Sequence, residues 1–502
     1  MDRVSKDKLI NIFERVFLTT IFIYAVLGSN NLTHGRSIIT PFMWIVFILG
    51  VFLLIYRLIN IKAYIRTTAI MPMIFMAFSI CLTTIVNRQY YLKQNLIICI
   101  YWFLFFFLLY TIPESTSIEK IKKNVCYLNC VLVIFITIGV LFSFWMLYTG
   151  VSEKISVSEA YYEYYQGFAI GRLWGIFINP NNSAVSAAIV IALLIYFIDK
   201  YKNIFIRVIC LLDMGLMILF VALTDSRTGA LCIGIVLGFF SMFGLIYRGI
   251  DKNVKNRLGY GLLVFVITFA VGITSFGITR KTKDWYNHIA TAISLNKQEQ
   301  YREGRYEELL AEGLSQEEIE KLIAQELLDE EFEANTVDRG YDLSKDLSNR
   351  RIDAWKSGME IFVSSPRVFI FGTTFKGFSD YAIEHIPETY IVNNDYGRFT
   401  TLDNEIINIM VAQGLIGLIA LLWMLIALFY GLFRYVFKVR KEDRLFVTML
   451  TSVVFALAGA AMFSSVMFYH FSQNTIFFWV ALGSLLNVVK TSASEKFDNE
   501  GA

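Results

Sequence analysis

The sequence has few charged residues for its length. Of its 502 residues, 17% are charged and 56% are hydrophobic, whereas about a quarter of the residues in an ordinary soluble domain are charged. This balance excludes a soluble globular protein, because too few polar residues are present to cover the apolar ones. We therefore expect the chain to be surrounded by lipid.

Sequence motifs for nucleotide, metal and serine-hydrolase chemistry are also absent. The chain has no P-loop, no glycine-rich dinucleotide turn after a strand and no G-x-S-x-G elbow, which argues against ATP-driven work. Its four histidines are His34, His288, His385 and His470. They form no H-E-x-x-H motif or paired ligand spacing. We expect neither a metal site nor a cofactor.

Cysteine is missing from the polar part of the chain. All six cysteines fall in apolar stretches, at positions 81, 99, 126, 130, 210 and 232. A disulfide framework is therefore not expected. Cys126 and Cys130 have helical spacing, but a metal site would need further ligands, so apolar packing is the preferred interpretation.

Long apolar runs dominate what the sequence does contain. A membrane span needs about 20 mostly apolar residues, and twelve stretches meet this requirement. They lie at about 10–28, 38–56, 67–86, 92–112, 125–149, 176–198, 204–223, 228–247, 258–279, 405–433, 445–468 and 474–490. The sequence thus predicts an all-α protein, a polytopic membrane helix bundle with about 12 transmembrane helices.

The distribution of lysine and arginine predicts the orientation of the bundle. With the N-terminus inside, the inner connections and termini carry 24 of the 45 basic residues and the short outer connections carry 6. Basic residues accumulate on the cytoplasmic side of short loops. We therefore expect both termini in the cytoplasm and the long loop between helices 9 and 10 on the extracytoplasmic side.

This orientation divides the chain into four predicted regions. They are transmembrane helices 1–9 (1–279), an extracytoplasmic and mostly helical loop domain (280–404), helices 10–12 (405–490) and a cytoplasmic tail (491–502) without expected structure. The loop is acidic, and residues 297–346 within it are interpreted as a solvated decoration. Ser315 and Glu318 have capping-box spacing ahead of a short amphipathic helix.

The first cluster of candidate functional residues precedes the sixth span. In the segment GRLWGIFINPNNSA, residues 171–184, Arg172 is followed by Asn179, Pro180 and Asn181. Proline lacks a backbone donor, and asparagine side chains can cap the groups it leaves unpaired. The sequence predicts either an interrupted helix next to a polar cavity or an ordinary capped helix start.

The second cluster is TDSRTG, residues 224–229, a short outer connection between two spans. Here Arg227 would lie at the level of the lipid head groups, where it either binds an anionic diphosphate or pairs with Asp225. The preceding span contains Asp213, whose deep position indicates either a functional group or a helix-packing hydrogen bond.

The third cluster occupies the last part of the long loop. Arg351 and Trp355 are four residues apart and are predicted to share one face of a helix. Asp403 lies directly before the tenth span, where a carboxylate can cap the helix or serve in catalysis.

The order of these clusters resembles the bacterial O-antigen ligase and O-antigen polymerase superfamily of membrane glycosyltransferases. The likeness covers most of residues 165–490. Its motifs are an R-x-x-G-x-x-x-N-P-N start of a span (Arg172, Gly175, Asn179, Pro180, Asn181), an S-R-x-G hairpin (Ser226, Arg227, Gly229), an R-x-x-x-W element with a proline and glycines (Arg351, Trp355, Pro366, Gly372, Gly377) and D-N before G-L-I-G (Asp403, Asn404, Gly414, Leu415, Ile416, Gly417). Lipopolysaccharide ligases of the family have a histidine where this chain has Asp403, which favours a repeat-unit polymerase.

The resemblance implies transfer of a glycan from undecaprenyl diphosphate to a sugar hydroxyl in the bacterial cytoplasmic membrane, yielding surface or capsular polysaccharide. Without a metal, fixed cations must stabilise the leaving diphosphate. The implied diphosphate clamps are Arg172, Arg227 and Arg351, and the implied base is Asp403, with His385 as second choice. The implied substrate-binding residues are Asn179, Asn181, Ser226, Trp355 and Asn404.

The implied partners are the lipid-linked donor and acceptor, the bilayer, and a flippase and chain-length regulator of the same pathway, with no nucleic acid. Three alternatives remain at this point. A ligase would move finished glycan onto a lipid, protein or wall acceptor. A transporter or flippase would have two similar halves with broken helices in matching positions, and a structural scaffold for an export complex would tolerate loss of all three arginines.

Overall fold

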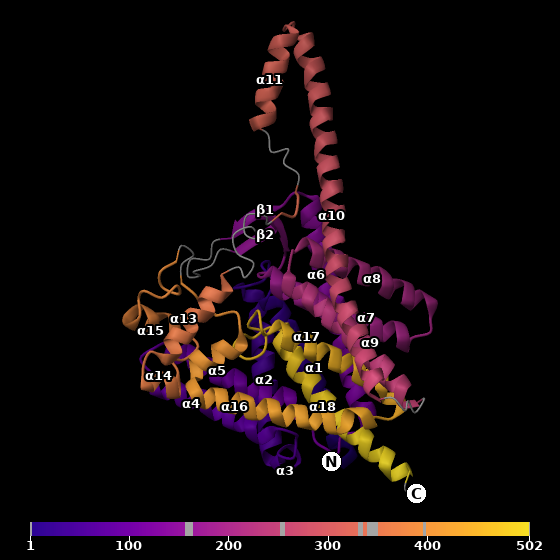
Figure 1. Ribbon diagram of the computed structural model, residues 1–502, viewed down its shortest axis with the longest axis vertical. Helices are drawn as coiled ribbons and strands as arrows, with labels where there is room; N and C mark the ends of the chain where they lie inside the picture. Colours follow the sequence, from indigo (N-terminus) through magenta and orange to yellow (C-terminus); the bar gives the residue numbers. More distant parts are fainter. Residues whose placement is uncertain are drawn as a thin grey trace.

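The computed structural model describes residues 3–155, 164–251, 257–329, 335–338, 350–394 and 398–500. It is a helix bundle with a long helical hairpin projecting from one end and both termini near the other (Figure 1). The helices that match the predicted spans are α1 (Arg3–Gly28), α2 (Thr40–Ile59), α4 (Ile70–Val86), α5 with the π-helix η2 (Leu92–Phe103, Leu104–Tyr110), α6 (Ile118–Tyr148), α7 (Pro180–Lys200), α8 (Ile204–Leu223), α9 (Arg227–Asp251), α10 (Arg257–Ala311), α16 (Glu405–Tyr435), α17 (Arg444–Ala460) and α18 (Gln473–Glu500). Short helical pieces connect them: η1 (Ser37–Ile39), α3 (Ile61–Tyr64), η3 (Val436–Lys438) and η4 (Lys441–Asp443).

Every predicted span overlaps one of these helices, so the predicted polytopic bundle is confirmed. The predicted span 445–468 was too long at its end, because α17 stops at Ala460. In the described part of the chain, eleven helices are long and apolar enough to cross a membrane, and α4 is a shorter apolar helix. The most deeply buried spans are α7, α17 and α18, whereas α2 and α10 expose most of their apolar side chains. Small residues on α7, among them Ala184, Ser186 and Ala188, are fully buried. Small side chains let membrane helices approach closely, which places α7 at the centre of the bundle.

The long loop is mostly helical, as predicted. Its first part is the continuation of α10, which runs without a break through residue 280 to Ala311 and carries the hairpin partner α11 (Gln316–Asp329). One half of the predicted capping box is present: the backbone N–H of Ser315 donates to Glu318 Oε2 at 3.0 Å. The Ser315 hydroxyl donates to the same oxygen at 2.6 Å. The two helices pack through Leu309, Ile319 and Ile323. The second part of the loop comprises α13 (Arg351–Val363), α14 (Pro366–Phe371) and α15 (Phe378–His385).

Two features differ from the sequence-based expectations. A small antiparallel sheet, β1 (Ser152–Ile155), β2 (Tyr164–Ala169) and β3 (Arg172–Gly175), precedes α7. In addition, α18 continues as a helix through the predicted tail to Glu500. The expectation of a tail without structure was wrong, because polar residues can extend an existing helix whose start is held by packing.

Two motif glycines allow the loop to pack against the membrane helix α16. Gly372 has φ +70°, and a Cβ there would lie 2.4 Å from the carbonyl group of Ala412. Gly414 interrupts the helical geometry of α16 at φ +66°, and a Cβ there would lie 2.5 Å from the carbonyl group of Ile370. The close approach lets the N–H groups of Thr373 and Thr374 donate to Val411 O and Ala412 O. The glycines of this motif therefore serve backbone packing.

We expect the substitution Gly372→Ala to destabilise the folded protein by roughly 3 kcal/mol or more, because it combines an unfavourable φ/ψ with a clash against backbone. The measurement is thermal unfolding of the detergent-purified protein, followed by the loss of the monodisperse peak. Gly215→Ala in α8 is the control, because a Cβ there meets nothing within 4 Å. A Gly372→Ala protein as stable as this control would contradict the packing role.

Candidate active site

The first candidate arginine lies in the sheet that precedes α7. Arg172 begins β3, and the tight turn before it contains Gly171 at φ +61°. A Cβ on Gly171 would lie 2.1 Å from Asp338 O, so the middle of the long loop passes directly over this turn. Arg172 is 7% exposed, donates from Nη2 to Asn181 Oδ1 at 3.0 Å and lies 5.7 Å from the centre of the Trp174 ring. Its guanidinium is thus fixed against the start of α7.

The segment Asn179–Asn182 forms a capped helix start. Asn179 Oδ1 accepts the N–H groups of Asn181 and Asn182, at 2.9 and 3.2 Å, and Pro180 occupies the first turn. Of the two interpretations of this motif, the capped start is the one the structure contains. Asn179 is consequently a cap, and Asn181 is a partner of Arg172.

The second candidate arginine begins α9. Arg227 is exposed, and Ser226 before it accepts the N–H of Gly229 at 3.1 Å. The carboxylate of Asp225 pairs with Lys283 of α10 at 3.1 Å. A Cβ on Gly229 would lie 2.6 Å from Ala184 Cβ, so the start of α9 packs on the first turn of α7. This contact places Arg227 at the same end of the bundle as Asn179–Asn182.

The third candidate arginine lies beside the candidate base. Arg351 Nε is 3.9 Å from Asp403 Oδ2, with side-chain exposures of 16% and 44%. Trp355, one turn further along α13, donates from Nε1 to Leu402 O at 2.8 Å. This bond holds α13 against the non-helical residues before α16. Arg351 Nε is buried and makes no hydrogen bond within the described residues. The pair therefore has unused donor capacity.

Asp403 is not the cap of α16. The cap is Asn404, whose Oδ1 accepts the N–H groups of Ile406 and Ile407, at 3.0 and 3.2 Å, and whose Nδ2 donates to Met462 O. Asp403 instead has φ +51°. Partial burial raises the pKa of the Asp403 carboxyl above its ordinary value, while the Arg351 guanidinium acts in the opposite direction. The capping interpretation of Asp403 was wrong, and its carboxylate is left available for chemistry.

A non-helical segment between α17 and α18, residues 461–472, connects the two halves of the site. Ser464 donates to Asn182 Oδ1 at 3.0 Å, and Ser465 lies 2.6 Å from the Thr401 hydroxyl. Glu405 Oε1 accepts the N–H groups of Met467 and Phe468, at 2.9 and 3.2 Å. The segment thus contacts both the first turn of α7, next to Asn181, and the residues just before Asp403.

His470, in the same segment, was not among the residues predicted from sequence. It lines a small pocket of about 140 Å³ together with Asn179, Asn182, Ser183 and Gln473. Burial and the nearby ammonium of Lys376 lower the pKa of His470 to about 4, so its imidazole is neutral at neutral pH. No sequence motif marks this histidine. Its only signal was its place on the predicted outer side.

The remaining predicted residues lie apart from this arrangement. His385 ends α15 and is half exposed, its Nδ1 lies 3.1 Å from Tyr381 O, and its ring stacks on the Tyr381 ring at 4.3 Å. These contacts are with its own helix, and the structure brings it to neither Asp403 nor Arg351 by a described contact. The Thr137 hydroxyl on α6 donates a hydrogen bond shared between Asp213 Oδ1 and Oδ2, at 3.0 and 2.9 Å, which is the helix-packing role. No group of three metal-ligating side chains occurs among the described residues.

Comparison with known proteins points to the same part of the chain. A family model described as O-antigen ligase matches residues 212–422. No curated protein matches the chain. The matched stretch runs from α8 into α16 and includes Arg227, Arg351 and Asp403. The family resemblance predicted from the motifs is confirmed over residues 212–422.

Proposed function

We propose that this chain polymerises lipid-linked oligosaccharide repeat units into a surface polysaccharide. The match of residues 212–422 to a family model described as O-antigen ligase supports membrane glycan transfer of this general kind. The donor is a glycan on undecaprenyl diphosphate, and the acceptor is a sugar hydroxyl of another repeat unit. The observation that carries the proposal is the pair of Arg351 and Asp403, 3.9 Å apart at the end of the bundle where the two other arginines also lie.

In the proposed reaction, Asp403 takes the proton of the acceptor hydroxyl while the oxygen attacks the anomeric carbon of the donor. The bond between that carbon and the diphosphate oxygen breaks, and the diphosphate leaves with the electron pair. Arg351, Arg227 and Arg172 stabilise the charge that develops on the leaving group. Guanidinium groups suit this task because their fork of donors matches phosphate oxygens.

The contacts support unequal roles for the three arginines. Arg351 has a buried Nε without a hydrogen bond in the described structure, so its N–H can donate to a ligand oxygen at little cost. Arg172 is fixed by Asn181 and Trp174, which suits a preorganised contact. Ser226 and Asn404 cap helices, and Trp355 holds α13 in place. We therefore assign these three, and likewise Asn179, to positioning the arginines and Asp403. We propose His470 in place of His385 as the second candidate base, because His470 lies beside Asn179 and Asn182.

Transfer of a finished glycan to another acceptor is the second candidate, because the matching family model is described as a ligase. Asp403 in place of the histidine expected for lipopolysaccharide ligases favours polymerisation. The two activities differ in what accumulates when the chain is deleted. Single repeats attached to their final acceptor, without long chains, would indicate a polymerase, whereas long chains left on the carrier would indicate a ligase.

The direct test is a reaction of the purified full-length protein with a lipid-linked repeat unit, without metal or nucleotide. We expect a ladder of elongated products on the carrier, because the leaving diphosphate itself supplies the driving force. The Arg351→Ala protein, purified in the same way, is the negative control. Absence of any product longer than the substrate, from a protein that is folded and monodisperse, would contradict the polymerase assignment.

A further inference from the structure

A second recessed site lies at the opposite end of the bundle from the candidate active site. It is a cleft of about 830 Å³ between α1 and α6, beside the end of α7. Its lining residues are Ile12, Arg15, Val16, Thr19, Thr20, Glu119, Lys122, Lys123, Cys126, Tyr127, Cys130 and Lys200. This is the end that holds both termini, which the distribution of basic residues predicts to be cytoplasmic.

The cleft contains four cationic side chains and one carboxylate. Lys122 pairs with Asp443 at 2.5 Å. Arg15 donates to Asn124 Oδ1 at 2.7 Å, and the ammonium of Lys200 lies 3.4 Å from Cys126 Sγ. Among the described residues, Arg15, Lys123 and Lys200 have no carboxylate within ion-pair distance. An excess of positive charge therefore remains in the cleft.

The walls of the cleft are apolar and face outward. Ile12, Val16 and Tyr127 are 53%, 43% and 52% exposed, on helices that the bilayer would surround. Cationic groups thus lie next to outward-facing apolar side chains near the predicted cytoplasmic ends of two spans. Basic pockets of this kind between transmembrane helices on the cytoplasmic side suit anionic lipid head groups.

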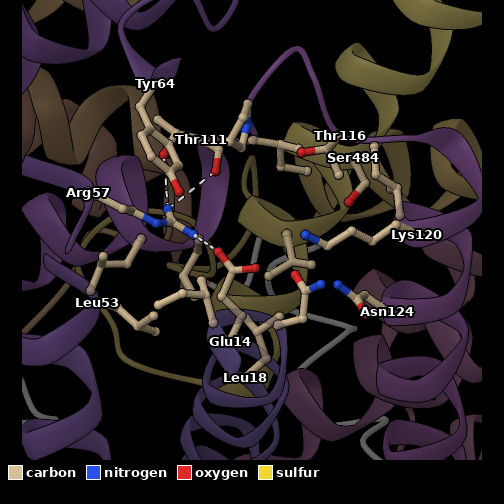
Figure 2. Close-up of a pocket in the computed structure, with 18 of the residues that line it drawn as sticks. Glu14, Leu18, Leu53, Arg57, Tyr64, Thr111, Thr116, Lys120, Asn124 and Ser484 are labelled. Carbon is tan, nitrogen blue, oxygen red and sulfur yellow. Dashed lines mark hydrogen bonds and ion pairs between the residues drawn. The ribbon is translucent and has the colours of Figure 1, made fainter. Parts of the chain in front are cut away.

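A neighbouring cavity differs in its charge balance. It measures about 430 Å³ and includes Arg57, Glu14, Thr111 and Lys120 (Figure 2). Arg57 donates to Glu14 Oε1 at 3.2 Å and to Thr111 Oγ1 at 3.0 Å, so its charge is already compensated. Lys120 is then the cavity's one cation without a carboxylate partner in the described residues, against three in the cleft. The charge excess is concentrated in the cleft.

We propose that the cleft binds an anionic phospholipid of the surrounding bilayer. The phosphate lies among Arg15, Lys123 and Lys200, and an acyl chain lies along Ile12, Val16 and Tyr127. The site is separate from glycan transfer, and it does not depend on the proposed polymerase activity.

The test compares lipid binding by the purified full-length protein in phosphatidylcholine vesicles with and without phosphatidylglycerol. We expect native mass spectrometry to detect phosphatidylglycerol retained by the wild-type protein and no comparable retention of phosphatidylcholine. The double variant Lys123→Gln/Lys200→Gln should bind phosphatidylglycerol roughly 30-fold more weakly. Each lysine near an anionic surface contributes about 1 kcal/mol, and a loss of about 2 kcal/mol corresponds to this factor.

The control is Lys62→Gln/Lys441→Gln, which removes two exposed lysines from the same predicted side outside the cleft. Equal loss of binding in both double variants would show that the lipid is held by the general positive charge of the surface. That result would contradict a specific site in the cleft. Protection of Cys130 from a maleimide by phosphatidylglycerol is a second measurement, because this exposed thiol lines the cleft. If inorganic phosphate displaced the lipid completely, the site would be a simple anion site and the lipid assignment would be wrong.

Discussion

Replacing Arg351 by alanine is expected to reduce polymer formation about 100- to 1,000-fold while the protein still inserts and folds. The guanidinium lies 3.9 Å from Asp403, and its buried Nε has no hydrogen bond in the described structure. Removing the Arg351 guanidinium takes away a donor proposed to stabilise the charge of the leaving diphosphate. It breaks few contacts of the folded protein. The measurement is the rate of elongation of a lipid-linked repeat unit, with polymer length in a deletion strain as the cellular equivalent.

Lys356→Ala is the matched control for this prediction. Lys356 lies on the same helix, its side chain is 70% exposed, and among the described residues its ion pair is with Asp353, three residues earlier on α13. Its removal should leave elongation unchanged. Arg351→Lys should recover part of the activity but not all, because an ammonium keeps the charge without the two-pronged geometry. Full activity of Arg351→Ala would end the proposal that this residue binds the diphosphate.

The membrane architecture could be predicted from the sequence because it depends on a strong local signal. A run of about 20 apolar residues specifies a span whatever its neighbours are. Each of the twelve predicted runs overlaps a helix, and the contact between Ser315 and the Glu318 side chain was predictable for the same reason, since it too is local. The three-stranded sheet before α7 was missed because its strands are only four to six residues long and depend on pairing with one another.

The candidate site was only partly predictable, because its parts are joined by distant contacts. Motif spacing identified Arg351 and Asp403, which lie together, but it could not decide which of two adjacent residues caps α16. Asn404 makes that cap, and Asp403 adopts φ +51° beside it. No sequence pattern identifies the segment 461–472 as part of the site. Its Ser464 contacts Asn182, which is 282 residues away in the sequence, and its Ser465 contacts Thr401, which is 64 residues away.

The substitution Asp403→Asn is expected to lower the elongation rate about 100- to 10,000-fold, because an amide cannot take the acceptor proton. The fold should persist, since the cap of α16 is Asn404 and the amide keeps the shape of the carboxylate. Asp353→Asn, on the exposed face of α13, is the control that removes a carboxylate of similar exposure. Wild-type activity of the Asp403→Asn enzyme would show that another group acts as the base.

The pH dependence of the elongation rate separates Asp403 from His470 as the base. A base acts in its deprotonated form, and burial raises the pKa of Asp403, so activity should fall as the pH drops through a value above that of an ordinary aspartate. Arg351 opposes this rise, so removing its charge should move the acidic limb to higher pH, whereas Arg351→Lys should not. The pKa of His470, about 4, would give an acidic limb as well. His470→Gln should leave the limb in place if Asp403 is the base, and loss of the limb in that variant would assign the proton transfer to the histidine.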